Sequence, residues 1–583
     1  MTFKKNISLA IALVLTASCI GLSAGCGEVY EESVDWSVEL NDKITIKALF
    51  PETGMPAFGT DRTAQLIEQA TGYKTNYREV ADGSADNEIN SILSTQGQYH
   101  ILKLTEAQYH PYVEQDAFLD LTPFLENTES GRILYQLIDL MPYGWDAVRY
   151  TKEDGTTGIY GIPDFGYTVM EDTALVWNTQ HLDAIGWYDD HDSVPQTIGE
   201  LTEALTQLQS HFGTDKDYHA LGIGGANMCD INPIMAAFDC PLFFYVDEDG
   251  KIQKDVYNEA FTGYVKYMNA LRKNEIISAS WQSAESASIC SMFANEKSSC
   301  VYLSYWWIQP LCNTIVNSKL AQKYGMENTY DAAHDEIIEW NTRIRGDGTN
   351  GSVNQKKARY LGDDAGIGYY TVIPFYMAKD ALYIIDYLSK KLQNFSLFYG
   401  GEEGVDWTVI DPPADGKEDF ANDIIYMKPW SYTLETEDGT VTKSGGGKWI
   451  KLTKSYIDNI VNNSMYCTGT NSIEAKVLFH LRETGFDAWP VGVEKDETII
   501  TNPMGMMPIL EHWAPISILS RTYAKRGLAG AIDAADPERT INITRQGLRE
   551  KSAKKNGVKY YYWSDDIVNE MTEWYNRVKL GKS

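Results

Sequence analysis

The chain has few basic residues for its length. Its 583 residues include 50 Lys and Arg against 81 Asp and Glu, which gives a formal net charge of -31. A surface this acidic repels both the phosphate backbone of nucleic acids and the headgroups of anionic lipids. The composition therefore excludes nucleic acid as a partner, and a membrane location would require a covalent lipid anchor or a spanning segment.

Long apolar runs are also absent after residue 25, since no later stretch reaches the ~20 residues that a membrane-spanning helix needs. At the N-terminus, two lysines precede an apolar run over residues 7–20, and LSAG at residues 22–25 leads to Cys26. This order is typical of a signal peptide. It resembles the bacterial lipoprotein lipobox, which implies cleavage after residue 25 and diacylation of the Cys26 thiol. Lipidation at Cys19, or a plain secretory signal, is the alternative.

The eight cysteines include no C-x-x-C pair, so the sequence gives poor support for a zinc or redox site. In an exported protein they can form disulfides, and the Cys229–Cys240 and Cys290–Cys300 pairs are close enough in sequence. Buried free thiols are the alternative. The cysteines beyond Cys26 are Cys229, Cys240, Cys290, Cys300, Cys312 and Cys467.

Familiar catalytic motifs are missing too. The sequence contains neither G-x-S-x-G nor a P-loop, and its nine histidines are dispersed. The DEDG segment at residues 247–250 lacks the later ligands of a calcium loop and predicts a hairpin turn instead. We predict no cofactor and no metal. The paired carboxylates of a glycosidase are defined by their spacing in the fold, so an enzyme that acts on glycans stays open as an alternative.

The remaining composition is that of an ordinary globular protein, with 43% hydrophobic and 22% charged residues. Because single cores stop growing near ~250–300 residues, a chain of 583 residues predicts two lobes. Residues 26–42 are polar and acidic, which suits a tether between the lipid and the folded body.

The local pattern at the start of the body predicts an α/β fold. Residues 43–50 alternate as a strand does, residues 61–70 have helical spacing, and residues 74–80 read as a second strand. Parallel neighbours need a crossover, so this strand–helix–strand order predicts a parallel sheet.

Later segments predict further elements of the same kind. Residues 201–208 and 264–271 have helical spacing, and residues 300–303 read as a buried strand. Residues 402–447 are rich in turn signals and predict hairpins and loops. A final helix is predicted over residues 564–578, with an apolar stripe that packs on a lobe.

Five segments come in the order found in a known family. They are GQYHIL (97–102) with DAFLDLTPFL (116–125), GIYGIP (158–163), ALVWN (174–178) with PQTIGEL (195–201), MFANEK (292–297) with CVY (300–302), and GGEEGVDWT (400–408). Together they resemble extracellular solute-binding protein family 1, which contains the maltose-binding-type proteins. Asn295 and Glu296 depart from the family's usual Gly, and the resemblance thins after residue 410.

This resemblance implies two α/β lobes joined by crossover strands, with a hinge at Pro163 and Gly166 and ligand held between the lobes. Lobe 1 would comprise residues 43–160 and 360–400, and lobe 2 residues 161–359 and 401–583. The implied function is capture of a carbohydrate, an oligosaccharide, by a monomeric lipoprotein on the extracellular face of a bacterial cell membrane. Its partners would be the permease subunits of an ABC importer. A glycan-active enzyme, or a surface sensor or adhesin with the same fold, is the alternative.

Sugar recognition needs aromatic faces for the C–H side of the ring and planar polar groups for its hydroxyls. The sequence contains 15 Trp and 37 Tyr, so position relative to the matched segments selects the candidates. The predicted ligand-binding residues are Phe58 and Asp61 after the first strand, Asp164 and Tyr167 after GIYGIP, Trp306 and Trp307 after the strand at 300–303, and Trp145 and Trp281 in loops.

Overall fold

The computed structural model describes most of the chain from residue 43 onward. The described residues are 36, 39–40, 43–51, 62–80, 85–140, 145, 148–152, 155–165, 173–225, 230–240, 244–246, 249, 251–253, 259–304, 307–316, 318–326, 332–363, 367–419, 422–461, 499–502, 513–550, 552–555, 558–561 and 565–579. The predicted signal peptide and Cys26 lie outside them.

The chain divides into two compact units. Unit 1 comprises Met1–Asp164, Gly368–Gly401 and Ser431–Gly445, and unit 2 comprises Phe165–Ile367, Glu402–Trp430 and Gly446–Ser583. Each unit therefore contains segments that are distant in sequence.

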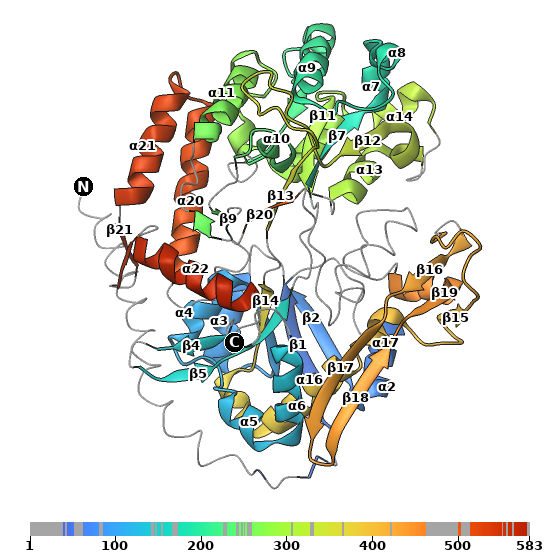
Figure 1. Cartoon of the computed structure of the whole chain (residues 1–583), viewed down its shortest axis with the longest axis vertical. Coiled ribbons are helices and arrows are strands. Elements are labelled where there is room, and N and C mark those ends of the chain that lie inside the picture. The colour runs from blue at the N-terminus through green and yellow to red at the C-terminus, as the bar shows by residue number, and fades with distance from the viewer. Residues whose placement is uncertain are drawn as a thin grey trace, which may run out of the picture. The chain divides into compact units, whose positions relative to one another are not determined.

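Unit 1 is built on a five-stranded sheet in the order β2-β1-β3-β14-β6 (Figure 1). Its strands are β1 Ile46–Pro51, β2 Thr75–Val80, β3 Ile101–Leu104, β6 Ile162–Phe165 and β14 Ile367–Val372. β1 pairs in parallel with β2 and β3, and β14 pairs antiparallel with β3. Helix α2 Arg62–Thr71 makes the crossover from β1 to β2. The predicted α/β class and the predicted strand–helix–strand order are confirmed.

Helices pack around this sheet. They are α3 Ala85–Thr95, α4 Glu106–Val113, α5 Thr122–Asn127, α6 Glu129–Asp139, α16 Ala381–Gln393 and α17 Phe395–Gly400. α16 packs against α2, α5 and α6. The start of α6 is set by Thr128, whose Oγ1 accepts a hydrogen bond of 2.9 Å from the Gly131 N–H. A short hairpin, β4 Arg149–Thr151 with β5 Thr157–Ile159, completes this part of unit 1.

Unit 2 has a second sheet in the order β12-β7-β11-β8. Its strands are β7 Thr173–Asn178, β8 Leu221–Gly222, β11 Cys300–Ser304 and β12 Ile338–Asn341. Every residue of β7 is buried, and β11 is buried along residues 300–303, as predicted. Helices cover this sheet, so its central strands read as continuous apolar runs.

Helices surround this sheet. They are α7 Thr179–Ala184, α8 Trp187–Asp190, α9 Ile198–Phe212, α10 Asn232–Ala236, α11 Glu259–Lys273, α12 Ser286–Ala294, α13 Ile308–Val316 and α14 Lys319–Tyr324. Two of them, α9 and α11, contain the helical segments predicted at residues 201–208 and 264–271. α9 starts with a capping box, in which Thr197 and Glu200 satisfy each other's backbone N–H groups. Two strands, β9 Tyr245–Val246 and β10 Ile252–Gln253, form the predicted hairpin around residues 247–250.

The described cysteines are free thiols. Cys240, Cys290, Cys300 and Cys312 are buried and form no disulfide, so the alternative of buried thiols holds for these four. Burial raises the pKa of the Cys290 thiol to about 12. Such thiols are packing groups with little thiolate at neutral pH. Cys229 and Cys467 lie outside the described residues.

The predicted hairpins of residues 402–447 are present. β15 Trp407–Val409, β16 Ile424–Met427 and β19 Lys448–Leu452 form a three-stranded antiparallel sheet in unit 2. The turn before β15 is closed by Asp406, whose Oδ2 accepts a hydrogen bond of 2.8 Å from the Glu402 N–H. Trp407 is buried against this turn.

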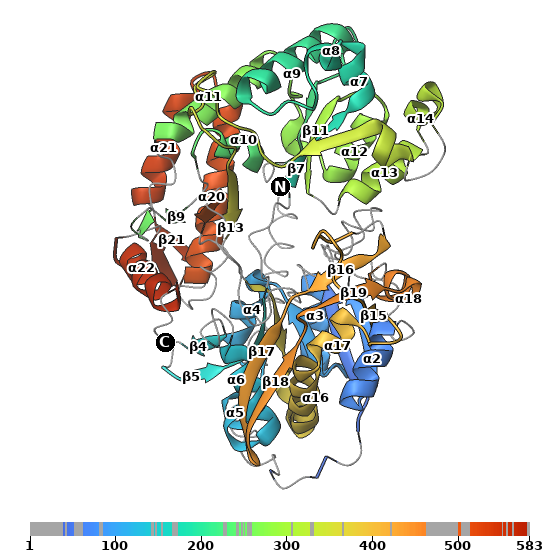
Figure 2. The ribbon, with the colours of Figure 1, turned by 45° about the vertical axis from the view of Figure 1, so that its right-hand side comes forward.

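A second hairpin, β17 Trp430–Thr436 with β18 Gly439–Gly445, runs as a long pair of strands (Figure 2). It packs on unit 1, where the Gln136 side chain of α6 donates to the Glu435 carbonyl at 2.9 Å and accepts from the Glu435 N–H at 2.7 Å. These bonds explain why residues 431–445 lie in unit 1, whereas the expected lobe division places them in lobe 2.

Three helices end the chain in unit 2, and these are α20 Trp513–Ile532, α21 Pro537–Glu550 and α22 Asp565–Lys579. α11 packs against both α20 and α21. The predicted last helix is confirmed, with Met571 and Tyr575 of its stripe buried. Short pairs β13 Tyr360–Asp363 with β20 Ile499–Asn502, and β21 Ser552–Lys555 with β22 Val558–Tyr561, lie in the same unit. Among the described helices, none has both the length and the apolar character of a membrane span.

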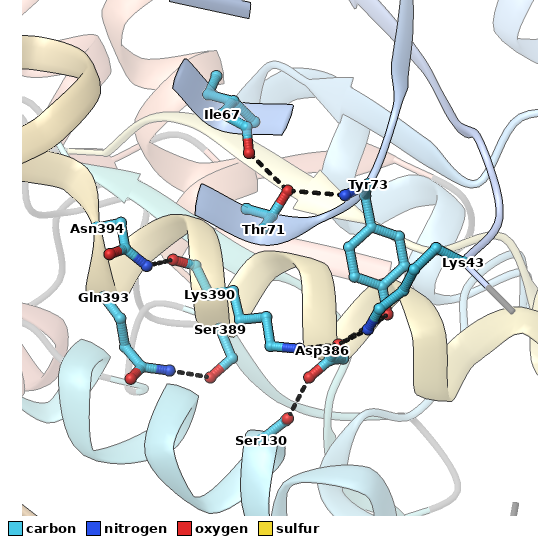
Figure 3. Close-up of polar contacts among 10 residues, drawn as sticks. All are labelled: Lys43, Ile67, Thr71, Tyr73, Ser130, Asp386, Ser389, Lys390, Gln393 and Asn394. Carbon is cyan, nitrogen blue, oxygen red and sulfur yellow. Dashed lines mark hydrogen bonds and ion pairs between the residues drawn. The ribbon is translucent and has the colours of Figure 1, made fainter. Parts of the chain in front are cut away.

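The N-terminal end of the folded body is tied to unit 1 by one buried carboxylate, Asp386 of α16 (Figure 3). Its Oδ2 accepts hydrogen bonds from Lys43 Nζ at 2.9 Å, Lys390 Nζ at 2.8 Å and Tyr73 OH at 2.7 Å. Its Oδ1 accepts one from Ser130 Oγ at 2.7 Å. The carboxylate, 5% exposed, thus joins the chain before β1, the α2–β2 turn and α6 to α16.

The Asp386 carboxylate stabilises the fold in its charged form. Burial alone would raise the pKa of Asp386, but hydrogen bonds from Lys390, Lys43, Ser130 and Tyr73 outweigh burial and lower the pKa to about 2. A carboxyl group with a lower pKa in the folded than in the unfolded chain stabilises the fold above its unfolded pKa. That contribution is lost as the pH falls from near 4 through about 2.

We therefore expect Asp386→Asn to lower the free energy of unfolding by about 3 kcal/mol at pH 7, since it removes the buried charge on which two partly exposed ammonium groups and two hydroxyl donors converge. The difference from wild type should shrink as the pH falls from 4 toward 2, where wild type also loses the charge. Urea unfolding at a series of pH values measures both effects. Asp139→Asn, at an exposed position at the end of α6, is the control and should change stability by less than ~0.5 kcal/mol. A difference that stays constant down to pH 2 would contradict the role of the charge.

Candidate functional site

The carboxyl edge of the sheet in unit 1 carries aromatic side chains. In open α/β sheets, ligands bind beyond the carboxyl ends of the parallel strands. β1, β2 and β3 all end at this edge, and the antiparallel β14 begins there. Ala48 of β1 lies opposite both Tyr77 of β2 and Ile101 of β3. Two residues further along, Phe50 and Lys103 therefore lie on the same face as Tyr77.

The side chains at this edge contact one another. The rings of Phe50 and Tyr77 stack with their centroids 4.7 Å apart and their planes at 23°. The Lys103 ammonium lies 5.4 Å from the centroid of the Phe50 ring and 4.9 Å from that of the Tyr369 ring in β14. All four side chains are half-buried, so part of each reaches solvent. We name Phe50, Tyr77, Lys103 and Tyr369 the aromatic–lysine cluster.

Neighbouring groups hold this cluster in place. The Tyr77 hydroxyl hydrogen-bonds to the hydroxyl of Tyr387, which is buried in α16. An ammonium over an aromatic face contributes about 0.5–1 kcal/mol at an exposed site. Rings fixed in this way offer apolar faces to a ligand, and the ammonium offers hydrogen-bond donors. The aromatic faces are one of the two kinds of group that sugar recognition needs, and the ammonium donates hydrogen bonds without the planar geometry of the second kind.

Sequence reasoning missed these four residues as site residues. Phe50 and Tyr77 lie in the two predicted strands, at residues 43–50 and 74–80, and the position of Phe50 at a strand end was the available signal. Tyr369 comes from a strand about 300 residues further along the chain, and no local pattern links it to the others.

Trp307 is the described member of the Trp306–Trp307 pair. β11 ends at Ser304, and Trp307 lies directly before α13, past the carboxyl end of that strand. Its indole is half-buried and packs against the core cluster of unit 2 that contains Leu303 and Leu311. Its contact with ligand stays a prediction, and Trp306 lies outside the described residues.

The two predicted loop tryptophans are packed inside their own units. Trp145 is 2% exposed, and its indole N–H donates to the Tyr135 carbonyl at 2.9 Å while its ring stacks on the Tyr135 ring. Trp281 is 1% exposed, and its N–H donates to Asp533 Oδ1 at 3.1 Å. The structure gives both rings a packing role.

The other predicted site residues are not placed by the structure. Phe58, Asp61 and Tyr167 lie outside the described residues. Asp164 lies in β6, where only its backbone is described. Their contacts with ligand stay predictions. Over the described ranges, no group of three or more His, Cys, Asp and Glu side chains is suited to hold a metal ion.

One buried network in unit 2 has the residue types of a hydrolase triad. His181 Nδ1 lies 2.6 Å from Ser299 Oγ, and His181 Nε2 lies 3.2 Å from Glu296 Oε1. The Tyr218 hydroxyl also contacts Ser299 Oγ, at 2.6 Å. Ser299 and His181 have no exposed surface, so Ser299 has no access to a substrate in this structure. A nucleophile must reach the scissile bond, and this network therefore serves packing.

Burial makes this network sensitive to acid. Burial lowers the pKa of His181 below its usual 6.5, although Glu296 opposes this effect. The hydrogen bond with His181 is the largest cause that lowers the pKa of Glu296, to about 2. Both groups bind protons more readily in the unfolded chain. Stability is thus lost as the pH falls below 6.5 for His181, and below 4.5 toward 2 for Glu296.

His181→Gln removes the titrating ring but keeps an amide that can hydrogen-bond. We expect the variant to melt at a lower temperature than wild type at pH 7, and to lose less of its melting temperature between pH 7 and pH 5. Thermal melts at several pH values test this. His191→Gln, which removes a half-buried histidine stacked on Trp187, is the matched control for the loss of a histidine ring. Equal slopes in His181→Gln and wild type would refute the expectation.

Comparisons with known proteins bear on the fold. No protein-family model and no curated protein matches the chain. Among solved structures, an HMO-binding ABC-transporter-associated solute-binding protein from Bifidobacterium longum infantis is 12% identical, with a TM-score of 0.51 over 92% of this chain and 99% of that one. The Streptococcus pneumoniae ABC-transporter substrate-binding protein FusA in complex with kestose is 13% identical, with a TM-score of 0.52 over 92% and 100%.

An extracellular solute-binding protein from Bifidobacterium longum subsp. infantis is 11% identical, with a TM-score of 0.51 over 93% of this chain and 100% of that one. At such identities the similarity establishes the fold. The fold that the family 1 resemblance implies is therefore confirmed, and the chain has the α/β fold of ABC-transporter solute-binding proteins.

Proposed function

We propose that the chain is the carbohydrate-binding receptor of a bacterial ABC importer. The observation that carries the proposal is the fold match, which spans 92% of this chain and 99–100% of two ABC-transporter binding proteins. One of these is described as HMO-binding, and the other is in complex with kestose. Since a fold hosts many functions, the proposal also needs a site with suitable chemistry.

The aromatic–lysine cluster supplies that chemistry in unit 1. The faces of Phe50, Tyr77 and Tyr369 suit the C–H side of a sugar ring, and the Lys103 ammonium can donate to ring oxygens and hydroxyls. We propose that this cluster contacts the ligand. From unit 2 we propose Trp307, together with Trp306, as ligand-binding residues. We propose the same role for four residues earlier in the chain, Phe58, Asp61, Asp164 and Tyr167.

We propose a receptor that binds its ligand, and not an enzyme that acts on glycans. The only triad-like arrangement described above is buried, and the aromatic–lysine cluster contains no carboxylate pair of its own. A receptor holds its ligand and passes it to a permease unchanged. We propose permease subunits as the protein partners and a monomer as the working form.

The first step of the test is a thermal-shift screen of the purified protein against neutral and acidic oligosaccharides. A ligand that binds only the folded state raises the melting temperature by mass action, by about 2.7 kcal/mol of stabilisation at 100 times Kd. We expect at least one oligosaccharide to raise the melting temperature and to remain intact on chromatography. Shortened products at enzyme-like turnover would contradict the receptor and favour a glycan-active enzyme.

With that oligosaccharide, we expect Phe50→Ala and Trp307→Ala each to weaken binding by about 2–4 kcal/mol, a loss of more than tenfold in affinity. Each change removes one aromatic face and leaves the other side chains of its unit unchanged. Calorimetry gives the affinity, and thermal melts separate a binding defect from an unfolded protein. Trp340→Ala, which removes a Trp that is 40% exposed on β12, is the matched control and should bind as wild type. Unchanged affinity in Phe50→Ala would remove the aromatic–lysine cluster from the site.

We further propose that the mature chain is anchored to the extracellular face of the cell membrane through diacylated Cys26. The support is the sequence before this residue, since the fold matches do not test it. A single thiol that carries two acyl chains gives stable anchoring, whereas one chain gives only marginal binding. A receptor held in this way stays near its permease.

Cys26→Ser should release the protein from the membrane fraction into the medium, because serine provides no thiol to acylate. Fractionation of cells that express the variant, followed by immunoblotting, measures the partition. Cys19→Ser is the matched control and should stay bound to the membrane. Equal membrane retention of Cys26→Ser and wild type would refute the anchor at this residue.

A further inference from the structure

The three-stranded sheet of β15, β16 and β19 in unit 2 has an unusual outer face. Along β19, Ile450 and Leu452 are buried, so the alternating residues Trp449 and Lys451 lie on the other face. The outer face of an antiparallel sheet ordinarily carries polar side chains. Here it carries a half-buried tryptophan, which the core of the sheet does not require.

The neighbouring strand adds a second ring. Tyr426 of β16 lies directly opposite Trp449, and the two ring centroids are 5.2 Å apart at an interplanar angle of 51°. Tyr426 is 37% exposed. On the other side of β19, the Ile410 N–H donates to the Trp449 carbonyl at 3.0 Å, which places Ile410 next to Trp449. We name Tyr426 and Trp449 the aromatic platform.

Charged groups of both signs border the aromatic platform. Glu418 Oε1 accepts a hydrogen bond of 2.9 Å from the Tyr426 N–H, and the Glu418 side chain is exposed. Lys451 is exposed on the outer face, opposite Thr408 in β15. The border thus provides a carboxylate that accepts hydrogen bonds and an ammonium that donates them. This balance complements a neutral ligand with many hydroxyls better than it complements a strongly acidic or basic surface.

The size of the face also selects the kind of ligand. Three strands about 4.8 Å apart and at most five residues long, at ~3.3 Å per residue, present a face on the order of 200 Å². A stable protein–protein contact buries about 800 Å² on each partner. The face alone supplies only a fraction of that area, whereas its size suits a few sugar rings.

We propose that the aromatic platform is a second carbohydrate site, which binds pyranose rings of a neutral polysaccharide by stacking on Tyr426 and Trp449. Glu418 and Lys451 hydrogen-bond to the ring hydroxyls. The site uses residues other than the aromatic–lysine cluster and Trp307, and it does not rest on transport. A receptor with such a site holds a long glycan at the cell surface in addition to the oligosaccharide it imports.

Affinity electrophoresis in gels that contain soluble starch, xylan, mixed-linkage β-glucan or glucomannan tests the proposal. We expect at least one of these to retard the wild-type protein, and the double variant Tyr426→Ala/Trp449→Ala to lose that retardation by at least tenfold in apparent affinity. Trp449→Phe, which keeps a ring, should retain most of the binding. Trp340→Ala removes an exposed tryptophan elsewhere in unit 2 and should be retarded as wild type is.

The outcomes separate this site from the proposed transport site. Loss of retardation in the platform variant but not in Phe50→Ala supports the second site, even if no oligosaccharide raises the melting temperature in the thermal-shift screen. Loss in Phe50→Ala but not in the platform variant overturns the second site and leaves the receptor intact. Absence of retardation of wild type in all four gels, or equal loss in Trp340→Ala, also overturns it. Tyr426→Ser alone provides the same comparison if the double variant does not fold.

Discussion

The buried carboxylate of Asp386 is the interaction on which unit 1 depends. The chain leaves unit 1 after Asp164 and returns at Gly368, so this unit is assembled from separate segments. Asp386 belongs to the returning segment, and its partner Lys43 is 343 residues away in sequence. The next residue, Tyr387, contacts the hydroxyl of Tyr77. Asp386 holds α16 in place, and the same helix contacts the aromatic–lysine cluster through Tyr387. The geometry of that cluster therefore depends on a hydrogen-bonded carboxylate outside it.

The sequence was sufficient to predict individual helices and strands, which depend on residues close together in the chain. The alternation at residues 43–50, the helical spacing after it and the buried run at residues 300–303 each predict an element that the structure contains. It was not sufficient where contacts join distant segments. Nothing near Asp386 in sequence indicates Lys43 or Tyr73 as partners, and Tyr369 reaches the carboxyl edge only because β14 inserts beside β3. Register between distant strands is a tertiary property.

The loop tryptophans also show that the sequence does not predict tertiary contacts. Trp145 and Trp281 lie in segments without strand or helix periodicity, and a loop position suggests exposure. Each ring is instead buried, and each indole N–H donates to a partner that the neighbouring sequence does not reveal.

At the MFANEK segment, Glu296 occupies a left-handed turn at φ 58° where the family usually has Gly. Its bonds to His181 and Lys323 offset the strain of that backbone conformation.

The long β17–β18 hairpin has a consequence for behaviour at high concentration. β18 is exposed over most of its length, and within the described chain it pairs only with β17. An exposed strand edge is a template on which other copies can add strands and aggregate. The sequence of β18, GTVTKSG, has one apolar residue among threonines, a lysine, a serine and glycines. Lysine and glycine disfavour strand addition, so the hairpin can extend from unit 1 without making its edge a nucleus for fibres.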